Sequence, residues 1–185
     1  AIARNEALSK SKGKFIAYLD ADDTWDRTKL EEQISFMIKH NYAFTCTSYK
    51  KIDENNKYLK SITIPEKIDY KTFLKNTIIQ TVGVMVNTEI TGKELLIMPN
   101  IRRRQDAATW CQLLKAGFNC YGIPEFLAYY RVVPNSLSSN KLKAIKGTWF
   151  LYRKIEKLSF AILKSCFCFI GYAYNAIKKR IYIKK

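Results

Sequence analysis

Gly13-Lys14-Phe15-Ile16-Ala17-Tyr18-Leu19-Asp20-Ala21-Asp22-Asp23 is the stretch that decides the fold. Its apolar run, residues 15–19, is bounded by a glycine and by acids, which is typical of a strand buried on both faces. The carboxylates of Asp20, Asp22 and Asp23 follow inside an acidic loop over residues 20–26. Ligands of open α/β sheets bind at the carboxyl ends of strands. The stretch therefore predicts an α/β fold with a ligand site at the end of this strand.

Strands and helices are predicted to alternate along the rest of the chain, which favours the α/β class. Apolar residues at 3–4 spacing predict helices, and short apolar runs between turn residues predict strands. The predicted helices are 1–12, 27–40, 69–76, 105–116 and 141–157. The predicted strands are 15–19, 42–49, 58–64, 82–87 and 121–133, with a turn at 53–56 between the second and the third. Gly13 and Gly117 are expected to end two of the helices.

The composition indicates a folded domain with an anionic partner. The 185 residues are 48% hydrophobic, enough for a core, and they carry a formal charge of +16. Such a charge favours nucleic acid, an anionic membrane or a polyphosphate ligand. The five cysteines form no metal-binding pattern and are expected to be free thiols. The single histidine, His40, excludes a His-rich metal site.

The acidic loop has three interpretations when it is taken alone. Alternating carboxylates can share a hard divalent cation that neutralises a diphosphate. The loop can equally be a solvated turn that caps the next helix. Asp20-Ala21-Asp22-Asp23-Thr24 also fits the D-x-D-x-T pattern of the haloacid-dehalogenase-like phosphatases. In those enzymes the first aspartate is the nucleophile and the second an acid/base.

A broader resemblance covers residues 1–140. Ala3-Arg4-Asn5-Glu6-Ala7 resembles the A-R-N-x-G/A segment of the inverting family 2 glycosyltransferases, which have the GT-A fold. The opening stretch at 13–23 resembles that family's G-x-[YF]-[IL]-x-[FY]-L-D-x-D-D signature. Arg103-Arg104-Gln105-Asp106 resembles its R-x-x-E-D segment, and Tyr130-Arg131 with Asn135-Ser136-Leu137-Ser138 resembles its closing Y-R-x-H-x-x-S-x-S stretch.

The resemblance implies a GT-A, Rossmann-like nucleotide-diphospho-sugar transferase fold. Residues 1–140 are then the C-terminal portion of the catalytic domain. The family's first strands, which hold the nucleotide base, are expected to lie before residue 1, so this chain alone is expected to bind donor weakly. Two positions depart from the family pattern: Gln105 stands for the usual Glu, and Val133 lies near the usual His.

The resemblance also implies roles for individual residues. Asp22 would bind Mg²⁺ or Mn²⁺ with Asp20, and Arg4, Asn5 and Asp20 would bind the nucleotide-sugar donor. Asp106, at the start of a predicted helix, would be the general base that activates an acceptor hydroxyl for one inverting displacement. Weaker predictions for phosphate or acceptor contacts are Arg104, Gln105 and Trp110. The competing interpretations are a surface charge for Arg4, a helix N-terminal acid for Asp106, a solvated basic turn at 102–104 and core packing for Trp110.

Residues 141–185 form a basic and aromatic tail with twelve Lys or Arg and one acid, Glu156. Such a mixture favours an anionic membrane surface. The apolar stretch 158–177 is long enough to span a bilayer, but Lys164 and Asn175 favour an interfacial helix. A helix packed on the catalytic domain is the alternative. No helix-turn-helix, RNA-recognition sheet or zinc finger supports a nucleic-acid partner.

Taken together, the sequence predicts a cytoplasmic enzyme, peripheral at the inner face of the cell membrane. It would transfer a sugar from a nucleoside-diphosphate sugar to a glycan or lipid-linked acceptor in surface polysaccharide biosynthesis. The alternatives are the phosphatase and a non-catalytic basic module that binds membrane or nucleic acid.

Overall fold

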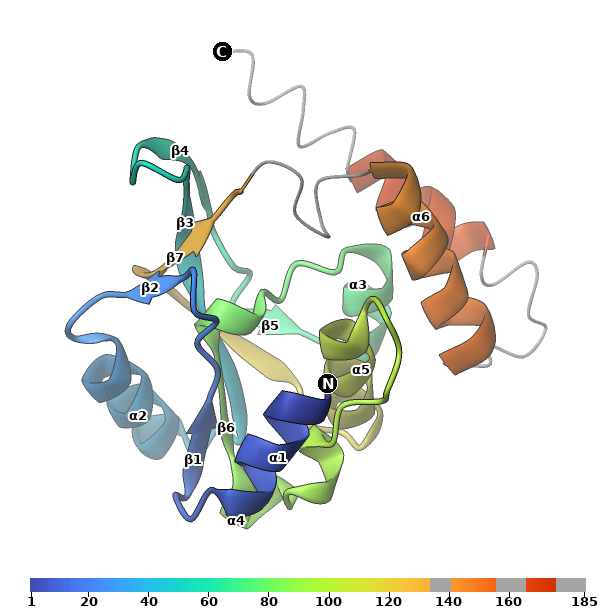
Figure 1. Cartoon of the computed structure of the whole chain (residues 1–185). Coiled ribbons are helices and arrows are strands. Elements are labelled where there is room, and N and C mark those ends of the chain that lie inside the picture. Colours follow the sequence, from blue (N-terminus) through green and yellow to red (C-terminus); the bar gives the residue numbers. More distant parts are fainter. Residues whose placement is uncertain (134–140, 156–165, 176–185) are drawn as a thin grey trace.

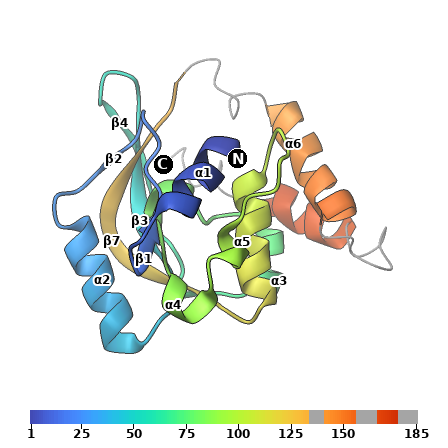
Figure 2. The same cartoon turned by 60° about the horizontal axis from the view of Figure 1, so that its bottom comes forward.

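The chain folds into three layers, with a mixed β-sheet between helices (Figures 1 and 2). A computed structural model describes residues 1–133, 141–155 and 166–175. One helix, α2, covers one face of the sheet, and α1, α3 and α5 cover the other (Figure 2). The helices of the C-terminal segment lie outside α3 and α5 (Figure 1).

The sheet has seven strands in the order β1-β6-β3-β7-β2, with β4 paired to β3 and β5 paired to β7. The strands are β1 (Phe15–Ala17), β2 (Thr24–Trp25), β3 (Phe44–Ile52), β4 (Tyr58–Ile62), β5 (Lys67–Ile68), β6 (Val84–Asn87) and β7 (Cys120–Arg131). The pair β3–β7 is parallel, and the other pairs are antiparallel. The five predicted strands and the hairpin turn at 53–56 are therefore confirmed, and β2 and β5 are additional.

The helices follow the predicted order. They are α1 (Ile2–Lys10), α2 (Lys29–His40), α3 (Tyr70–Lys75), α4 (Thr88–Thr91), α5 (Gln105–Lys115) and α6 (Lys141–Phe150). Single 3-10 turns form η1 (Thr81–Gly83) and η2 (Glu94–Leu96), and a π-helix, η3 (Leu151–Ile155), follows α6. Gly117 has φ +96° just after α5, a conformation that favours glycine, so its predicted role as a helix stop is confirmed. The five cysteines are free, as predicted.

The strand β1 is less buried than its sequence predicts. Ile16 and Tyr18 are buried, but Phe15 and Ala17 are half-buried and Leu19 is 49% exposed. β1 is the edge strand of the sheet, and these three side chains alternate with the buried ones, so they project from its other face. The prediction of a strand buried on both faces is therefore wrong. Of the residues of α1 only Leu8 is buried, and Ile2 is 72% exposed.

Gly122 of β7 lies in very close contact with the backbone of the segment that leads into β5. A Cβ atom at Gly122 would lie 2.2 Å from the carbonyl oxygen of Pro65. The N–H of Gly122 donates to the carbonyl of Glu66 at 2.9 Å, just before β5. Only glycine allows β7 and the chain entering β5 to come this close.

A buried polar network joins α2 to the sheet. Lys29 is fully buried, its ammonium donates to Gln33 at 2.7 Å, and it lies 4.2 Å from the centre of the Trp25 ring. Gln33 in turn donates to Thr45 and to the carbonyl of Gly83. Burial lowers the pKa of Lys29 from 10.5 to about 8. The charged lysine therefore destabilises the fold at neutral pH, although its hydrogen bond positions α2.

We expect the free energy of unfolding to rise relative to a Lys29→Met variant as pH increases from 7 to 10. Between the folded pKa of about 8 and the unfolded value of 10.5, the unfolded chain binds more protons, so stability rises with pH. The fall in the pKa of Lys29 from 10.5 to about 8 corresponds to about 3 kcal/mol in the free energy of unfolding. Urea unfolding of both proteins at several pH values measures it. Parallel stability curves would show that Lys29 ionises normally.

Candidate active site

Residues 20–23 of the acidic loop form a tight turn after β1, called the acidic turn below, which is bound to the end of β7. The N–H of Asp23 donates to the carbonyl of Asp20 at 3.1 Å and closes the turn. Asp23 is buried, and its carboxylate accepts the backbone N–H of Arg131 at 2.8 Å. Burial raises the pKa of Asp23 to about 6, and the charges of Asp22 and Asp20 add to the effect. Asp23 is therefore an anchor of the turn, and it points away from solvent.

The side chain of Arg131 holds the same turn from outside. Its guanidinium donates to the carbonyl of Asp22 at 2.7 Å and to the carbonyl of Asp53 at 2.9 Å. These contacts connect the acidic turn to the β3–β4 hairpin. With its backbone fixed on one side by Asp23 and on the other by Arg131, Asp22 presents an exposed carboxylate.

The first turns of α1 close the other side of the acidic turn. Arg4 forms an ion pair with Asp20, in which both side chains are partly exposed. Both residues line a groove of about 340 Å³ that runs between α1 and β1. Asn5 faces elsewhere: its amide donates to the carbonyl of Met98 and accepts the N–H of Met98, both at 2.9 Å. The side chain of Asn5 therefore fixes α1 to the segment that leads into α5.

Asp106 lies in the first turn of α5, as predicted. The hydroxyl of Thr81, in η1, lies 3.3 Å from its carboxylate. The same short turn accepts a hydrogen bond from the indole of Trp25 at the carbonyl of Val82, 2.8 Å away. Trp25 follows the acidic turn in the chain by two residues. The turn η1 therefore bridges the acidic turn and Asp106, which lie more than 80 residues apart in sequence.

The acidic turn offers carboxylates to a divalent cation. In the part of the chain that the structure describes, no three His, Cys, Asp or Glu side chains are grouped closely enough to hold a metal ion. Asp20 and Asp22 nevertheless fit Mg²⁺, which proteins commonly bind through one or two carboxylates while substrate phosphates and water complete its octahedron.

One of the weaker predictions needs correction. Trp110 is fully buried, with its ring 5.7 Å from both Tyr18 and Phe44, so it packs in the core and cannot stack on an acceptor sugar. The guanidinium of Arg104 donates to the hydroxyl of Tyr172 at 3.0 Å, which joins the start of α5 to the C-terminal segment, and its predicted phosphate contact stays a prediction. The role of Gln105, beside Asp106 at the start of α5, stays a prediction.

Arg131 and Thr81 are site residues that sequence reasoning did not assign. Arg131 lies in the Tyr130-Arg131 motif, but its partners Asp22 and Asp53 are 109 and 78 residues away. Thr81 carried no signal, because a threonine before a predicted strand is ordinary. Their positions become visible only when the chain is folded.

The C-terminal segment packs on the domain along one side and exposes apolar side chains on the other. Leu151, Tyr152 and Cys168 are buried in the main hydrophobic cluster. Within helical residues 166–175, Phe167, Ile170 and Tyr174 are 75%, 64% and 63% exposed. No described helix is long and apolar enough to cross a membrane. Half of the 158–177 stretch lies outside the described residues, so its membrane geometry stays a prediction.

Comparison with known proteins identifies the family. The family model described as "Glycosyl transferase family 2" matches residues 1–93. The chain is 50% identical over 182 residues to TuaG of Bacillus subtilis, a glycosyltransferase whose name links it with teichuronic acid biosynthesis. The match covers 98% of this chain and 71% of that protein. It is 37% identical over 154 residues to the UDP-Glc:alpha-D-GlcNAc-diphosphoundecaprenol beta-1,3-glucosyltransferase WfgD of Escherichia coli, covering 80% of this chain and 57% of WfgD.

A solved structure has the same fold. The S. aureus protein TarS, in the crystal structure of its residues 1–349 with UDP-GlcNAc, superposes with a TM-score of 0.63 at 15% identity. The match covers 92% of this chain and 50% of that chain, so the present chain spans about half of the solved structure. These matches confirm the predicted GT-A-like fold and exclude the phosphatase interpretation of the acidic loop. The protein belongs to glycosyl transferase family 2.

Proposed function

We propose that this protein transfers a sugar, with inversion, from a nucleoside-diphosphate sugar to a lipid-linked acceptor in the synthesis of a surface polysaccharide. The observation that carries the proposal is the acidic turn: Asp23 and Arg131 fix its backbone so that Asp22 projects its carboxylate from the end of the sheet. The names of WfgD and TuaG, which mention a diphosphoundecaprenol acceptor and teichuronic acid, support the acceptor class.

The donor would bind between α1 and the acidic turn. Asp22, with Asp20, would hold the diphosphate through Mg²⁺ or Mn²⁺, which when bound acts as a Lewis acid on the leaving group. Arg4 already pairs with Asp20, and its guanidinium suits a phosphate oxygen. Asn5 would act indirectly, because its contacts with Met98 hold α1 in place. Uridine diphosphate is the natural probe, since the names of WfgD and of the TarS complex both contain it.

The acceptor would be activated by Asp106. The first turn of a helix favours an ionised carboxylate, because the backbone N–H groups there are unpaired and positive. Asp106 would take the proton of the acceptor hydroxyl as its oxygen attacks the anomeric carbon and the diphosphate leaves from the opposite face. Thr81 would orient the carboxylate through its hydroxyl.

The C-terminal segment would attach the enzyme to the inner face of the cell membrane, where a lipid-linked acceptor is found. Phe167, Ile170 and Tyr174 follow helical spacing, so their exposed side chains form one apolar stripe. Residues 141–185 carry twelve cations and one acid, which matches an anionic lipid surface. Packing of Tyr152 and Cys168 on the domain would hold this stripe in a fixed orientation.

Asp22→Asn is expected to abolish metal-dependent binding of uridine diphosphate while the fold survives, because an amide cannot replace a carboxylate toward a hard cation. Calorimetric titration with Mn²⁺ and uridine diphosphate measures the affinity. Glu31→Gln, an exposed acid on α2, is the control with the same change of charge. Unchanged affinity in Asp22→Asn would remove the metal assignment.

Asp106→Asn is expected to lower turnover about 100-fold or more, the scale of a lost general base. Donor affinity should change little, because the residue acts on the acceptor. Release of nucleoside diphosphate, measured with protein expressed from the complete reading frame, gives the rate. Near-normal turnover would place the base elsewhere.

The triple variant Phe167→Ser, Ile170→Ser, Tyr174→Ser is expected to bind anionic vesicles at least tenfold more weakly, since three exposed apolar side chains would leave the membrane. High salt should weaken binding of the unmodified protein only in part, because salt screens the cations but not the apolar stripe. Co-sedimentation with vesicles containing phosphatidylglycerol measures both effects.

The control for this stripe is Ile2→Ser, Ile38→Ser, Leu59→Ser, which removes three side chains exposed elsewhere by 72%, 65% and 48%. Equal binding of both triple variants would show that the stripe makes no membrane contact. A steep loss of binding with salt would indicate a purely ionic partner.

A further inference from the structure

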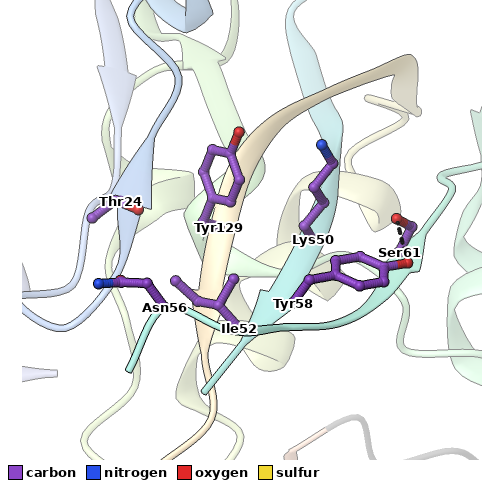
Figure 3. Close-up of a pocket in the computed structure, with 7 residues that line it drawn as sticks. All are labelled: Thr24, Lys50, Ile52, Asn56, Tyr58, Ser61 and Tyr129. Carbon is purple, nitrogen blue, oxygen red and sulfur yellow. Dashed lines mark hydrogen bonds between the residues drawn. The ribbon is translucent and has the colours of Figure 1, made fainter. Parts of the chain in front are cut away.

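A second cavity, of about 630 Å³, lies on the sheet face formed by β2, β7, β3 and β4. Its residues are aromatic, hydroxylic, amide or cationic, with one aliphatic residue beneath them. They are Thr24, Lys50, Ile52, Asn56, Tyr58, Ser61 and Tyr129 (Figure 3). None of them is assigned to the donor or to the general base.

Strand register aligns four of these side chains in one row. Thr24 pairs with Tyr129, Tyr129 pairs with Lys50, and Lys50 pairs with Ser61. Residues paired directly across neighbouring strands project from the same face of a sheet. Figure 3 shows the row, with the Tyr129 ring and the Lys50 side chain rising from adjacent strands. The row of four is therefore built by the sheet itself, and the β3–β4 turn adds Asn56.

The row combines ring faces with hydrogen-bonding groups. Tyr58 is 57% exposed, and its hydroxyl lies 3.1 Å from that of Ser61, which holds the ring at the side of the cavity. Ile52, only 6% exposed, forms the floor. Aromatic faces accept the C–H face of a sugar ring, and hydroxyl and amide groups from Thr24, Ser61 and Asn56 can pair with its hydroxyls. This combination is suited to a saccharide.

The ammonium of Lys50 favours a ligand that carries a negative charge. Its ammonium lies 5.8 Å from the ring centres of Tyr129 and Phe126, and it belongs to none of the ion pairs formed by the described residues. A cation held among aromatic rings attracts an anionic group, and a charge-assisted hydrogen bond is about twice as strong as a neutral one. The saccharide that matches this surface therefore carries a carboxylate or a phosphate.

The cavity is connected to the acidic turn. Thr24, one of its walls, directly follows the anchor Asp23. Arg131 bonds to the carbonyls of both Asp22 and Asp53, and it pairs in register with Ile52 at the floor. A glycan that extends from the reacting end could thus run over β2 onto this face.

We propose that this sheet face is a subsite for an acidic sugar unit of the glycan, held by Lys50 between Tyr58 and Tyr129 and separate from the donor site. The inference rests on the proposed glycosyltransferase activity only for the origin of the glycan. Binding itself needs neither donor nor metal.

The test is titration of the ¹⁵N-labelled protein with a tetrasaccharide of galacturonic acid, followed by NMR, with neutral maltotetraose as the comparison. We expect shifts at the amides of residues 50–61 and 129 with the acidic sugar and much weaker shifts with the neutral one. Lys50→Met should weaken binding about tenfold, the scale of one lost charge-assisted contact, and Tyr58→Ala should weaken it with both sugars.

Lys60→Met is the matched control, because Lys60 pairs with Lys51 one residue along β3 and so projects from the opposite face. It should leave affinity unchanged. Equal affinity for both tetrasaccharides, or equal affinity of Lys50→Met and the unmodified protein, would overturn the proposal. Asp22→Asn should bind the acidic tetrasaccharide normally, and Lys50→Met should bind uridine diphosphate normally, so failure of the subsite and failure of the donor site are distinguishable.

Discussion

The contact between the Asp23 carboxylate and the backbone N–H of Arg131 is the constraint on which the rest of the site depends. Burying a carboxylate is unfavourable, and the pKa of Asp23, raised to about 6, reflects that cost. The contact joins the acidic turn to the end of β7. Because Asp23 faces inward and the guanidinium of Arg131 holds the carbonyl of Asp22, the Asp22 side chain is left in solvent. Adjacent aspartates thereby differ: Asp23 anchors the turn, and the carboxylate of Asp22 stays exposed.

Packing in the core determines where Asp106 lies. Trp110 is buried between Tyr18 at the end of β1 and Phe44 in β3, which fixes α5 against the sheet. Asp106 is one helical turn before Trp110, and Asp20 is two residues beyond Tyr18, so this packing joins the helix that carries Asp106 to the strand that leads into Asp20. An aromatic residue that resembles a sugar-stacking platform in sequence therefore serves the site by positioning it.

Three surfaces of the fold suit different parts of one proposed reaction. The groove beside α1 suits the donor, the row on β2, β7, β3 and β4 suits an acidic glycan, and the apolar stripe at 166–175 suits a membrane. Arg131 connects the first two, since it bonds to the acidic turn and to the β3–β4 hairpin. Arg104 joins the third to the domain through Tyr172, at the residue that precedes α5. Through these contacts all three surfaces are attached to the same domain.

The sequence by itself determined the order of the elements, the acidic turn after β1, Asp106 in the first turn of a helix and the stop at Gly117. These features are local, because periodicity, capping and turn chemistry act over a few residues. Tertiary structure alone decided that Asp23 is buried while Asp22 is exposed, that Trp110 belongs to the core and that Lys50 stands beside Tyr129. Those outcomes depend on burial and on register between strands about 80 residues apart, which no local pattern encodes.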